Sequence, residues 1–184
     1  MKKTLVTIAM LLCGSVASAQ DWSGAYLGIS AASGSGEVGV PAISATDTLD
    51  SGTLYGLFAG YNLQRNNLVY GAELAFHSGE INSAAFPSQG VDRLMDLKGR
   101  LGYAAGPGLV YGVLGYSTNR AFVTSGTSDG SGVSFGVGYD YQMNDAFTIG
   151  GEYLSRKMQN DETVAIRELE PDISTFTLRA AMKF

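Results

Sequence analysis

The stretch STFTLRAAMKF, residues 174–184, carries the clearest structural signal in the sequence. Its side chains alternate between two kinds along its whole length. One set is apolar and consists of Phe176, Leu178, Ala180, Met182 and Phe184. The other set is largely polar and consists of Thr175, Thr177, Arg179, Ala181 and Lys183. Because alternate side chains of a β-strand point to opposite faces, this stretch predicts a strand with one apolar and one polar face.

The same alternation recurs through most of the chain, whereas helical spacing is almost absent. In 131–143, for example, the apolar Phe135 and Val137 alternate with Gly136 and Gly138. Glycine is frequent, at 25 of 184 residues, and its interleaving with aromatic residues is typical of tightly curved strands. Together with 174–184, the pattern predicts eight strands, the others being 22–33, 53–64, 68–80, 92–105, 109–122, 131–143 and 146–158.

The connectors between these strands alternate in length. The short ones are made of turn-forming residues, Arg65-Asn66-Asn67, Gly106-Pro107-Gly108 and Asn144-Asp145. The long ones, 34–52, 81–91, 123–130 and 159–173, are mostly polar. This pattern is typical of barrels that cross an outer membrane. We therefore predict an all-β fold, an eight-stranded antiparallel up-and-down transmembrane β-barrel with short periplasmic turns and longer extracellular loops.

The positions of the aromatic residues indicate which face points outward. Six of them, Tyr61, Tyr70, Tyr103, Tyr111, Tyr141 and Phe147, are assigned to the apolar faces and lie within four residues of a short turn. They would form a ring at one level, as an interfacial aromatic girdle does. The alternative is a soluble barrel whose apolar face points inward around a ligand. Membrane fractionation would separate the two cases.

The first 19 residues have the features of an export signal. Lys2 and Lys3 precede an apolar run that is too short to span a bilayer, and Ala17-Ser18-Ala19 forms a small-residue cleavage site. We expect a signal peptide at 1–19 and a barrel domain at 20–184. Removal of the signal would take away Cys13, the only cysteine, and leave 10 Lys and Arg (12 − 2) against 17 Asp and Glu. So acidic a chain is a poor partner for nucleic acid.

Two segments carry a resemblance to a known family. Asp21-Trp22-Ser23-Gly24-Ala25-Tyr26-Leu27-Gly28 and the alternation ending in Phe184 resemble the small eight-stranded outer-membrane barrels. These include the opacity-type proteins, the transmembrane domain of outer membrane protein A and related porin-family proteins. The resemblance implies location in the cell outer membrane, contact with its lipids and lipopolysaccharide, and a role for Phe184 as a signal to the barrel-assembly machinery. It also implies surface roles such as adhesion, envelope integrity or immune exposure, with loops that contact an extracellular partner.

Charged residues on the polar faces predict a network inside the barrel. Counted from the short turns, these charges lie at similar heights, which makes Glu73–Arg100 and Glu152–Arg179 candidate pairs. The predicted network consists of Glu73, Lys98, Arg100, Asp140, Glu152 and Arg179. Charges in so narrow a lumen must be paired or hydrated. Two functions stay open: a structural surface protein with a salt-bridged lumen, or a narrow diffusion channel with a charged gate.

Catalysis, metals and cofactors find little support in the sequence. His77 is the only histidine, and its neighbour Ser78 would point to the opposite face of the strand. We expect His77 to be a hydrated lumen residue near the outer rim. We therefore expect no enzymatic activity, no metal site and no cofactor.

Overall fold

The computed structural model describes residues 20–40, 45–82, 90–123, 126–160 and 170–184. The expected signal peptide lies outside these residues. The described chain forms eight strands and no helix. They are β1 (Gly24–Val40), β2 (Ala45–Arg65), β3 (Leu68–Asn82), β4 (Gly90–Ala105), β5 (Gly108–Val123), β6 (Gly126–Gln142), β7 (Phe147–Asn160) and β8 (Glu170–Lys183).

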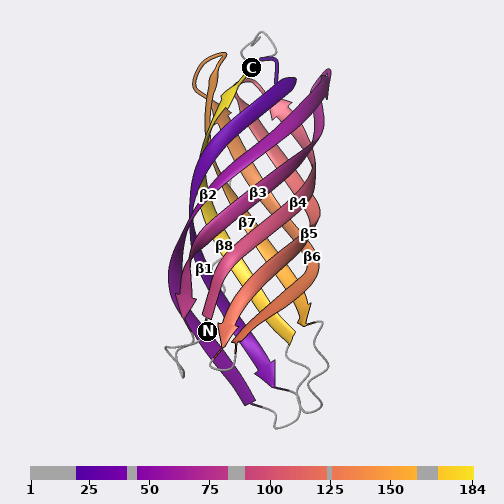
Figure 1. Ribbon diagram of the computed structural model, residues 1–184. Helices are drawn as coiled ribbons and strands as arrows, with labels where there is room; N and C mark the ends of the chain where they lie inside the picture. Colours follow the sequence, from indigo (N-terminus) through magenta and orange to yellow (C-terminus); the bar gives the residue numbers. More distant parts are fainter. Residues whose placement is uncertain (1–19, 41–44, 83–89, 124–125, 161–169) are drawn as a thin grey trace, which may run out of the picture.

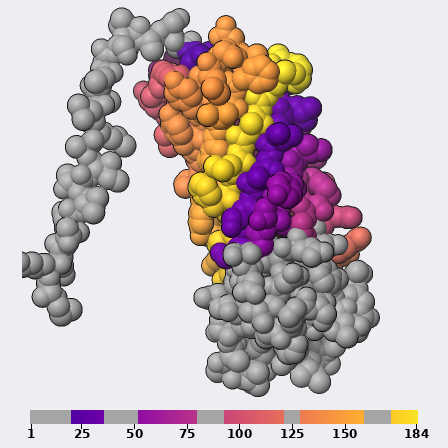
Figure 2. Space-filling model, turned by 90° about the vertical axis from the view of Figure 1, so that its left-hand side faces the viewer, coloured from indigo at the N-terminus to yellow at the C-terminus, as the bar shows by residue number. Residues whose placement is uncertain are grey.

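The strands form one closed barrel in which every strand pairs with its neighbours in the sequence (Figure 1). β1 also pairs with β8, with Tyr26 opposite Lys183 and Ser33 opposite Phe176. Figure 2 shows these two strands, indigo and yellow, lying side by side along the barrel wall. All pairs are antiparallel, so the predicted fold is confirmed.

The strands are strongly staggered around the barrel. A path of paired residues that starts at Tyr26 and passes through Gly60, Glu73 and Lys98 returns to β1 at Gly36 instead of Tyr26. Such a stagger tilts the strands against the barrel axis, by about 35–45° in barrels of this kind. Residues at equal distances from a turn therefore do not lie directly opposite each other.

The short turns are built by residues that accept the required backbone geometry. Asn66 and Gly106 have positive φ angles of 55° and 57°, a region open mainly to glycine and asparagine. At the third turn, the side chain of Asn144 accepts hydrogen bonds from the backbone N–H groups of Ala146 and Phe147, both at 2.9 Å. These turns lie at the end of the barrel that also holds the C-terminus (Figure 1).

The strands extend further from the membrane than the sequence pattern predicts. β1 and β2 continue to Val40 and from Ala45, through a segment predicted to be the loop 34–52. A register shift between Gly34 and Gly36 marks the point where the regular alternation ends. Backbone pairing does not require a regular alternation of apolar and polar side chains, so the strands continue beyond the point where the sequence pattern ends.

The outer wall of the barrel is apolar. Leu57, Leu114 and Val137 are 59%, 66% and 63% exposed, which is the reverse of the burial expected in a soluble barrel. The described part of the chain contains no helix long and apolar enough to cross a membrane.

Candidate functional site: the charged lumen

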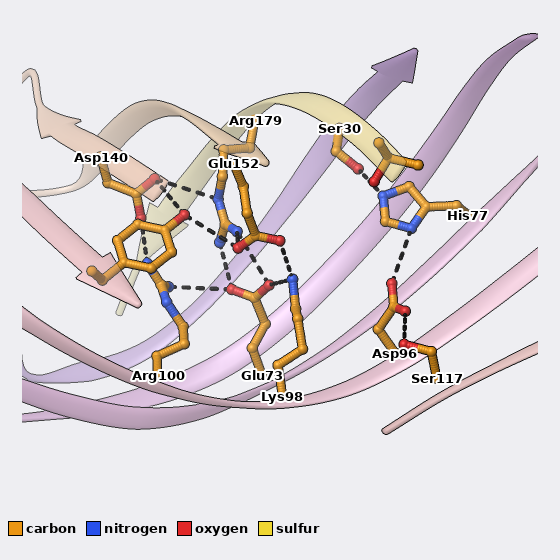
Figure 3. A network of polar contacts seen from close by, with 12 residues as sticks. Ser30, Glu73, His77, Asp96, Lys98, Arg100, Ser117, Asp140, Glu152 and Arg179 are labelled. Atoms are coloured by element: carbon orange, nitrogen blue, oxygen red, sulfur yellow. Dashed lines mark hydrogen bonds and ion pairs between the residues drawn. The ribbon is translucent and has the colours of Figure 1, made fainter. Parts of the chain in front are cut away.

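The lumen holds a cluster of six ionisable side chains, three acidic and three basic, which we call the lumen ion cluster. Its members are Glu73, Lys98, Arg100, Asp140, Glu152 and Arg179, each at most 7% exposed (Figure 3). Glu73 of β3 contacts all three cations. Its carboxylate lies 2.8 Å from Lys98 Nζ and 3.2 Å from Arg100 Nη1, and it also pairs with Arg179 Nη2. The cations are thus held around one central acid.

Two further acids complete the cluster from the opposite wall. Glu152 of β7 lies 2.5 Å from Lys98 Nζ and 3.0 Å from Arg179 Nη1. Asp140 of β6 lies 2.6 Å from Arg100 Nη2 and 3.4 Å from Arg179 Nε. The two pairs expected from the sequence, Glu73–Arg100 and Glu152–Arg179, are both in contact. Every charge in the cluster has at least two opposite charges beside it.

Aromatic side chains also contact the arginines of the cluster. The Tyr26 hydroxyl accepts a hydrogen bond from Arg100 Nη1 at 2.8 Å and donates one to Glu73 at 2.8 Å. The Arg179 guanidinium lies 4.1 Å from the centre of the Phe58 ring. Cation–π contacts of this kind are strongest where water is excluded. The inner face is therefore a mixed layer of charges and aromatic rings.

Tyr111 belongs to this layer, and its assignment to the aromatic girdle is wrong. It is 2% exposed, its ring centre lies 3.9 Å from the Arg100 guanidinium carbon, and its hydroxyl lies 3.3 Å from Glu152. The alternation pattern gave the wrong face for Tyr111 because both faces of β5 are apolar near its start. The inward Leu109 and Val113 resemble the outward Val110 and Leu114, so periodicity gives no contrast there.

The other predicted girdle residues lie on the outer wall near the short turns. Tyr61, Tyr70, Tyr103, Tyr141 and Phe147 are 55%, 37%, 60%, 42% and 51% exposed. Phe184, the expected assembly signal, is 69% exposed, and its backbone N–H donates to the Ala25 carbonyl at 2.9 Å.

A second polar group lies beside the lumen ion cluster, centred on Asp96. Arg156 donates to both carboxylate oxygens of Asp96, at 2.8 and 2.7 Å, and Ser117 donates to one of them at 2.5 Å. His77 is 4% exposed, and its Nε2 lies 3.2 Å from Ser30 Oγ (Figure 3). Sequence reasoning placed His77 in the lumen but did not group it with Asp96 and Arg156.

Ser30, His77 and Asp96 are the residue types of an acyl-transfer triad, but their arrangement is unsuited to that chemistry. His77 Nδ1 lies 3.8 Å from Asp96, beyond hydrogen-bond distance, and the carboxylate is already occupied by Arg156 and Ser117. Ser30 itself is only 8% exposed. Within the described residues, no group of three or more acidic, histidine or cysteine side chains is placed to hold a metal ion.

Apolar side chains close the lumen on both sides of the polar layers. Toward the extracellular end they are Ala32, Leu54, Leu94, Met158 and Ile173. A second group begins at the periplasmic end with Trp22, Val69, Ala104 and Leu109 and continues beside the ion cluster with Tyr111, Val113 and Leu154. Both groups are almost fully buried, so the charged layers are enclosed between two apolar layers.

The segment before β1 holds the periplasmic closure in place. Trp22 is 4% exposed, and its backbone N–H donates to the Gln64 side chain at 2.7 Å. The Ser23 backbone N–H donates to the Asp21 carboxylate at 2.8 Å, which lowers the pKa of that carboxyl group. Lys183 Nζ donates to the Asp21 carbonyl oxygen, linking this segment to β8.

The chain matches a known family of β-barrel proteins. Residues 4–184 match the family model described as the outer membrane protein beta-barrel domain. The chain belongs to this family. It is therefore an outer-membrane β-barrel protein, located in the outer membrane in contact with its lipids.

Two curated proteins and one solved structure illustrate the relationship. The chain is similar to the 22 kDa outer membrane protein of Rhizobium leguminosarum bv. viciae, with 32% identity over 66% of this chain and 55% of that protein. This match therefore spans about half of that relative. It is also similar to the 31 kDa outer-membrane immunogenic protein of Brucella melitensis, with 27% identity over 89% of this chain and 83% of that protein.

The solved structure is Ail, the attachment invasion locus protein of Yersinia pestis. Its TM-score is 0.56 at 14% identity, with 88% of this chain and 99% of that chain covered. At this identity the likeness concerns the fold.

The outer-membrane β-barrel also has features that sequence reasoning missed. A second set of exposed aromatic residues lies toward the extracellular end and consists of Tyr55, Phe76, Tyr116, Phe135, Tyr153 and Phe176. Beyond it the outer wall becomes polar, at Ser33, Thr53, Ser78, Arg93, Thr118, Ser131 and Ser174. The sequence does contain a signal for this second aromatic level, because its residues continue the apolar faces of the same strands further from the short turns. The two aromatic levels bound the lipid-facing band.

Proposed function

We propose that this outer-membrane β-barrel is a non-enzymatic structural surface protein, whose lumen is a packed support for the wall and not a conduit. The observation that carries the proposal is the lumen ion cluster. Its three acids and three bases balance in charge, contact one another directly and are enclosed between two apolar layers.

The energetics of buried charges support this role. An unpaired ion in so narrow a lumen would cost several kcal/mol, whereas a paired and hydrogen-bonded ion recovers most of that cost. A conducting lumen would need groups that exchange protein contacts for water as an ion passes. In this cluster each such exchange would break several short contacts at once. We therefore expect the cluster to fix the wall geometry and to oppose ion flow.

The working surface would then be the extracellular end of the barrel. The strands extend beyond the lipid-facing band there, and connections on a rigid scaffold are a common place for recognition. A relative named an outer-membrane immunogenic protein supports surface exposure. Ail, in one of its solved structures, is in complex with the heparin analogue sucrose octasulfate. We propose that the extracellular end contacts lipopolysaccharide and an external partner, and that Phe184 is read by the barrel-assembly machinery.

A narrow diffusion channel is the second candidate, and one observation favours it. Several buried polar atoms in the described lumen have no protein hydrogen-bond partner, among them Asn62 Oδ1, His77 Nδ1, Asn119 Oδ1 and Ser134 Oγ. Buried polar atoms of this kind are commonly satisfied by water. A chain of such sites past the ion cluster would provide a hydrated path.

Single-channel recording separates the two candidates. The chain is refolded in detergent, its folding is verified by heat-dependent gel mobility, and its conductance is measured in a planar bilayer. We expect inserted, folded protein to be silent. Discrete steps that grow when Glu73 is changed to Gln, and not when the exposed Asp129 is changed to Asn, would instead establish the channel and make the cluster its gate.

The non-enzymatic part of the proposal has its own test. Folded protein is incubated with phospholipids and with chromogenic esters, beside a His77→Ala variant. We expect no hydrolysis above background for either protein. Hydrolysis by the parent that is lost in His77→Ala would overturn this part and direct attention to Ser30.

A further inference from the structure

Two arginines lie directly opposite each other on the outer wall at its polar boundary. Arg93 of β4 pairs in register with Arg120 of β5, and both side chains are exposed. Like charges at directly opposed positions of two strands destabilise the sheet. An anion bound between the two guanidinium groups would offset this repulsion, so the pair indicates an anion-binding position.

The surroundings of the pair are those of an amphiphile site. A groove of about 340 Å³ is lined by two bases and one acid, Arg93, Arg120 and Asp129, by the apolar Phe76 and Met95, and by polar residues that include Thr118 and Ser131. Phe76 and Met95 belong to the lipid-facing band, being 41% and 45% exposed. The groove therefore joins an apolar wall on the membrane side to two guanidinium groups on the extracellular side.

The neighbouring charges leave a net positive site. Arg120 Nε lies 3.4 Å from Asp129, in a pair whose side chains are 46% and 74% exposed, so water weakens it. The Arg93 guanidinium carbon lies 5.8 Å from the Phe76 ring centre. Among the side chains that the structure describes, no acidic group forms an ion pair with Arg93. Guanidinium groups bind phosphate oxygens in a bidentate manner, which suits two such groups side by side.

We propose that Arg93 and Arg120 form a binding site for the phosphate of an outer-leaflet lipid, a phosphorylated saccharolipid of the lipopolysaccharide type, with an acyl chain along Phe76 and Met95. The height of the site selects this source of phosphate, because the pair lies where the apolar wall ends and lipid headgroups begin. The inference deepens the proposed contact with lipopolysaccharide and does not depend on whether the lumen conducts.

The test measures binding of a defined lipid to the folded full chain. Refolded protein in a non-ionic detergent is titrated with bisphosphorylated lipid A and with its dephosphorylated form, and bound lipid is counted by native mass spectrometry. The variants are Arg93→Gln, Arg120→Gln, the double variant and Arg93→Lys. Arg65→Gln is the matched control, since Arg65 is an exposed arginine beside a short turn at the periplasmic end. Heat-dependent gel mobility verifies that each variant is folded.

We expect the double variant to bind the phosphorylated lipid about tenfold more weakly, which corresponds to about 1.4 kcal/mol, with little change for the dephosphorylated lipid. Arg93→Lys should fall between the parent and Arg93→Gln, because lysine keeps the charge but loses the bidentate geometry. An unchanged affinity in the double variant, or an equal loss in Arg65→Gln, would overturn the site. Displacement of lipid A by inorganic phosphate at equal concentration would assign the site to a free anion and overturn the lipid source.

Discussion

Lys98 and Glu152 form an ion pair across the lumen, with Lys98 Nζ 2.5 Å from Glu152 Oε1, although their strands β4 and β7 share no edge. The same lysine contacts Glu73 on the adjacent strand β3 at 2.8 Å. One side chain thus connects the near wall of the barrel to the far wall. The lumen ion cluster consists of ion pairs that link strands across the lumen in this way, and its contribution to the free energy of unfolding can be measured.

The first prediction concerns the central acid of the cluster. Glu73→Gln removes a charge that faces Lys98, Arg100 and Arg179, so buried cations lose part of their compensation. Removing one partner from a buried ion pair typically costs about 3–5 kcal/mol. We expect a loss of this size in the free energy of unfolding, measured by urea titration in detergent with gel mobility as the readout.

The matched control for Glu73→Gln is Asp129→Asn, which removes an acid from the exposed pair with Arg120. We expect a change within about 1 kcal/mol there, because exposed pairs contribute little. A double variant, Glu73→Gln with Lys98→Met, should recover part of the loss by restoring the charge balance. If Glu73→Gln lowered the free energy of unfolding no more than Asp129→Asn does, the cluster would not stabilise the barrel.

The second prediction tests the inward position of Tyr111. Tyr111→Ala would leave a cavity beside Arg100 and remove a ring that belongs to the same buried apolar group as Leu109 and Val113, at a cost of about 3–5 kcal/mol. Tyr103→Ala is the comparison, because Tyr103 lies on the outer wall and is 60% exposed. Unfolding in urea should separate the two variants clearly. Equal losses would mean that Tyr111 faces the lipid as a girdle residue.

The third prediction uses two glycines that flank Tyr111. A Cβ at Gly138 would overlap the Tyr111 ring, whereas a Cβ at Gly112 would meet nothing closer than 3.9 Å. We expect Gly138→Ala to lower stability by about 1–3 kcal/mol through overpacking. Gly112→Ala should be neutral or raise stability slightly, because it restricts the unfolded chain. Thermal unfolding followed by circular dichroism measures both. The reverse order would show that the ring does not lie against Gly138.

The fourth prediction separates assembly in the cell from folding in vitro. Phe184→Ala changes an exposed side chain, while the backbone bond from Phe184 to Ala25 can persist. If Phe184 is an assembly signal, the variant should accumulate poorly in outer-membrane fractions and still refold normally in detergent. Phe147→Ala is the control, because Phe147 is a girdle residue that is 51% exposed. Equal accumulation of both variants would leave Phe184 as an ordinary girdle residue.

Much of the fold follows from local information. Each strand shows its own alternation, as in Phe176, Leu178 and Ala180, and each short turn contains its own turn former, such as Asn66 or Gly106. Lipid imposes the apolar outer face on every strand independently, so no knowledge of the other strands is needed. The closed eight-stranded barrel was therefore predictable, and so was the inward position of most lumen charges.

Pairing inside the lumen is a different matter, because it depends on register and stagger. Counting from the turns suggested Glu73–Arg100 and Glu152–Arg179 but gave no hint of Lys98–Glu152 across the barrel. Nor could it separate the Asp96 group from the rest, or place Tyr111 where both faces of β5 are apolar. The sequence by itself determined the strands, the turns and the lipid-facing wall, since each of these obeys a local rule. Only the closed, tilted barrel decided which charges meet, because a small shift of one strand past its neighbour brings different side chains together.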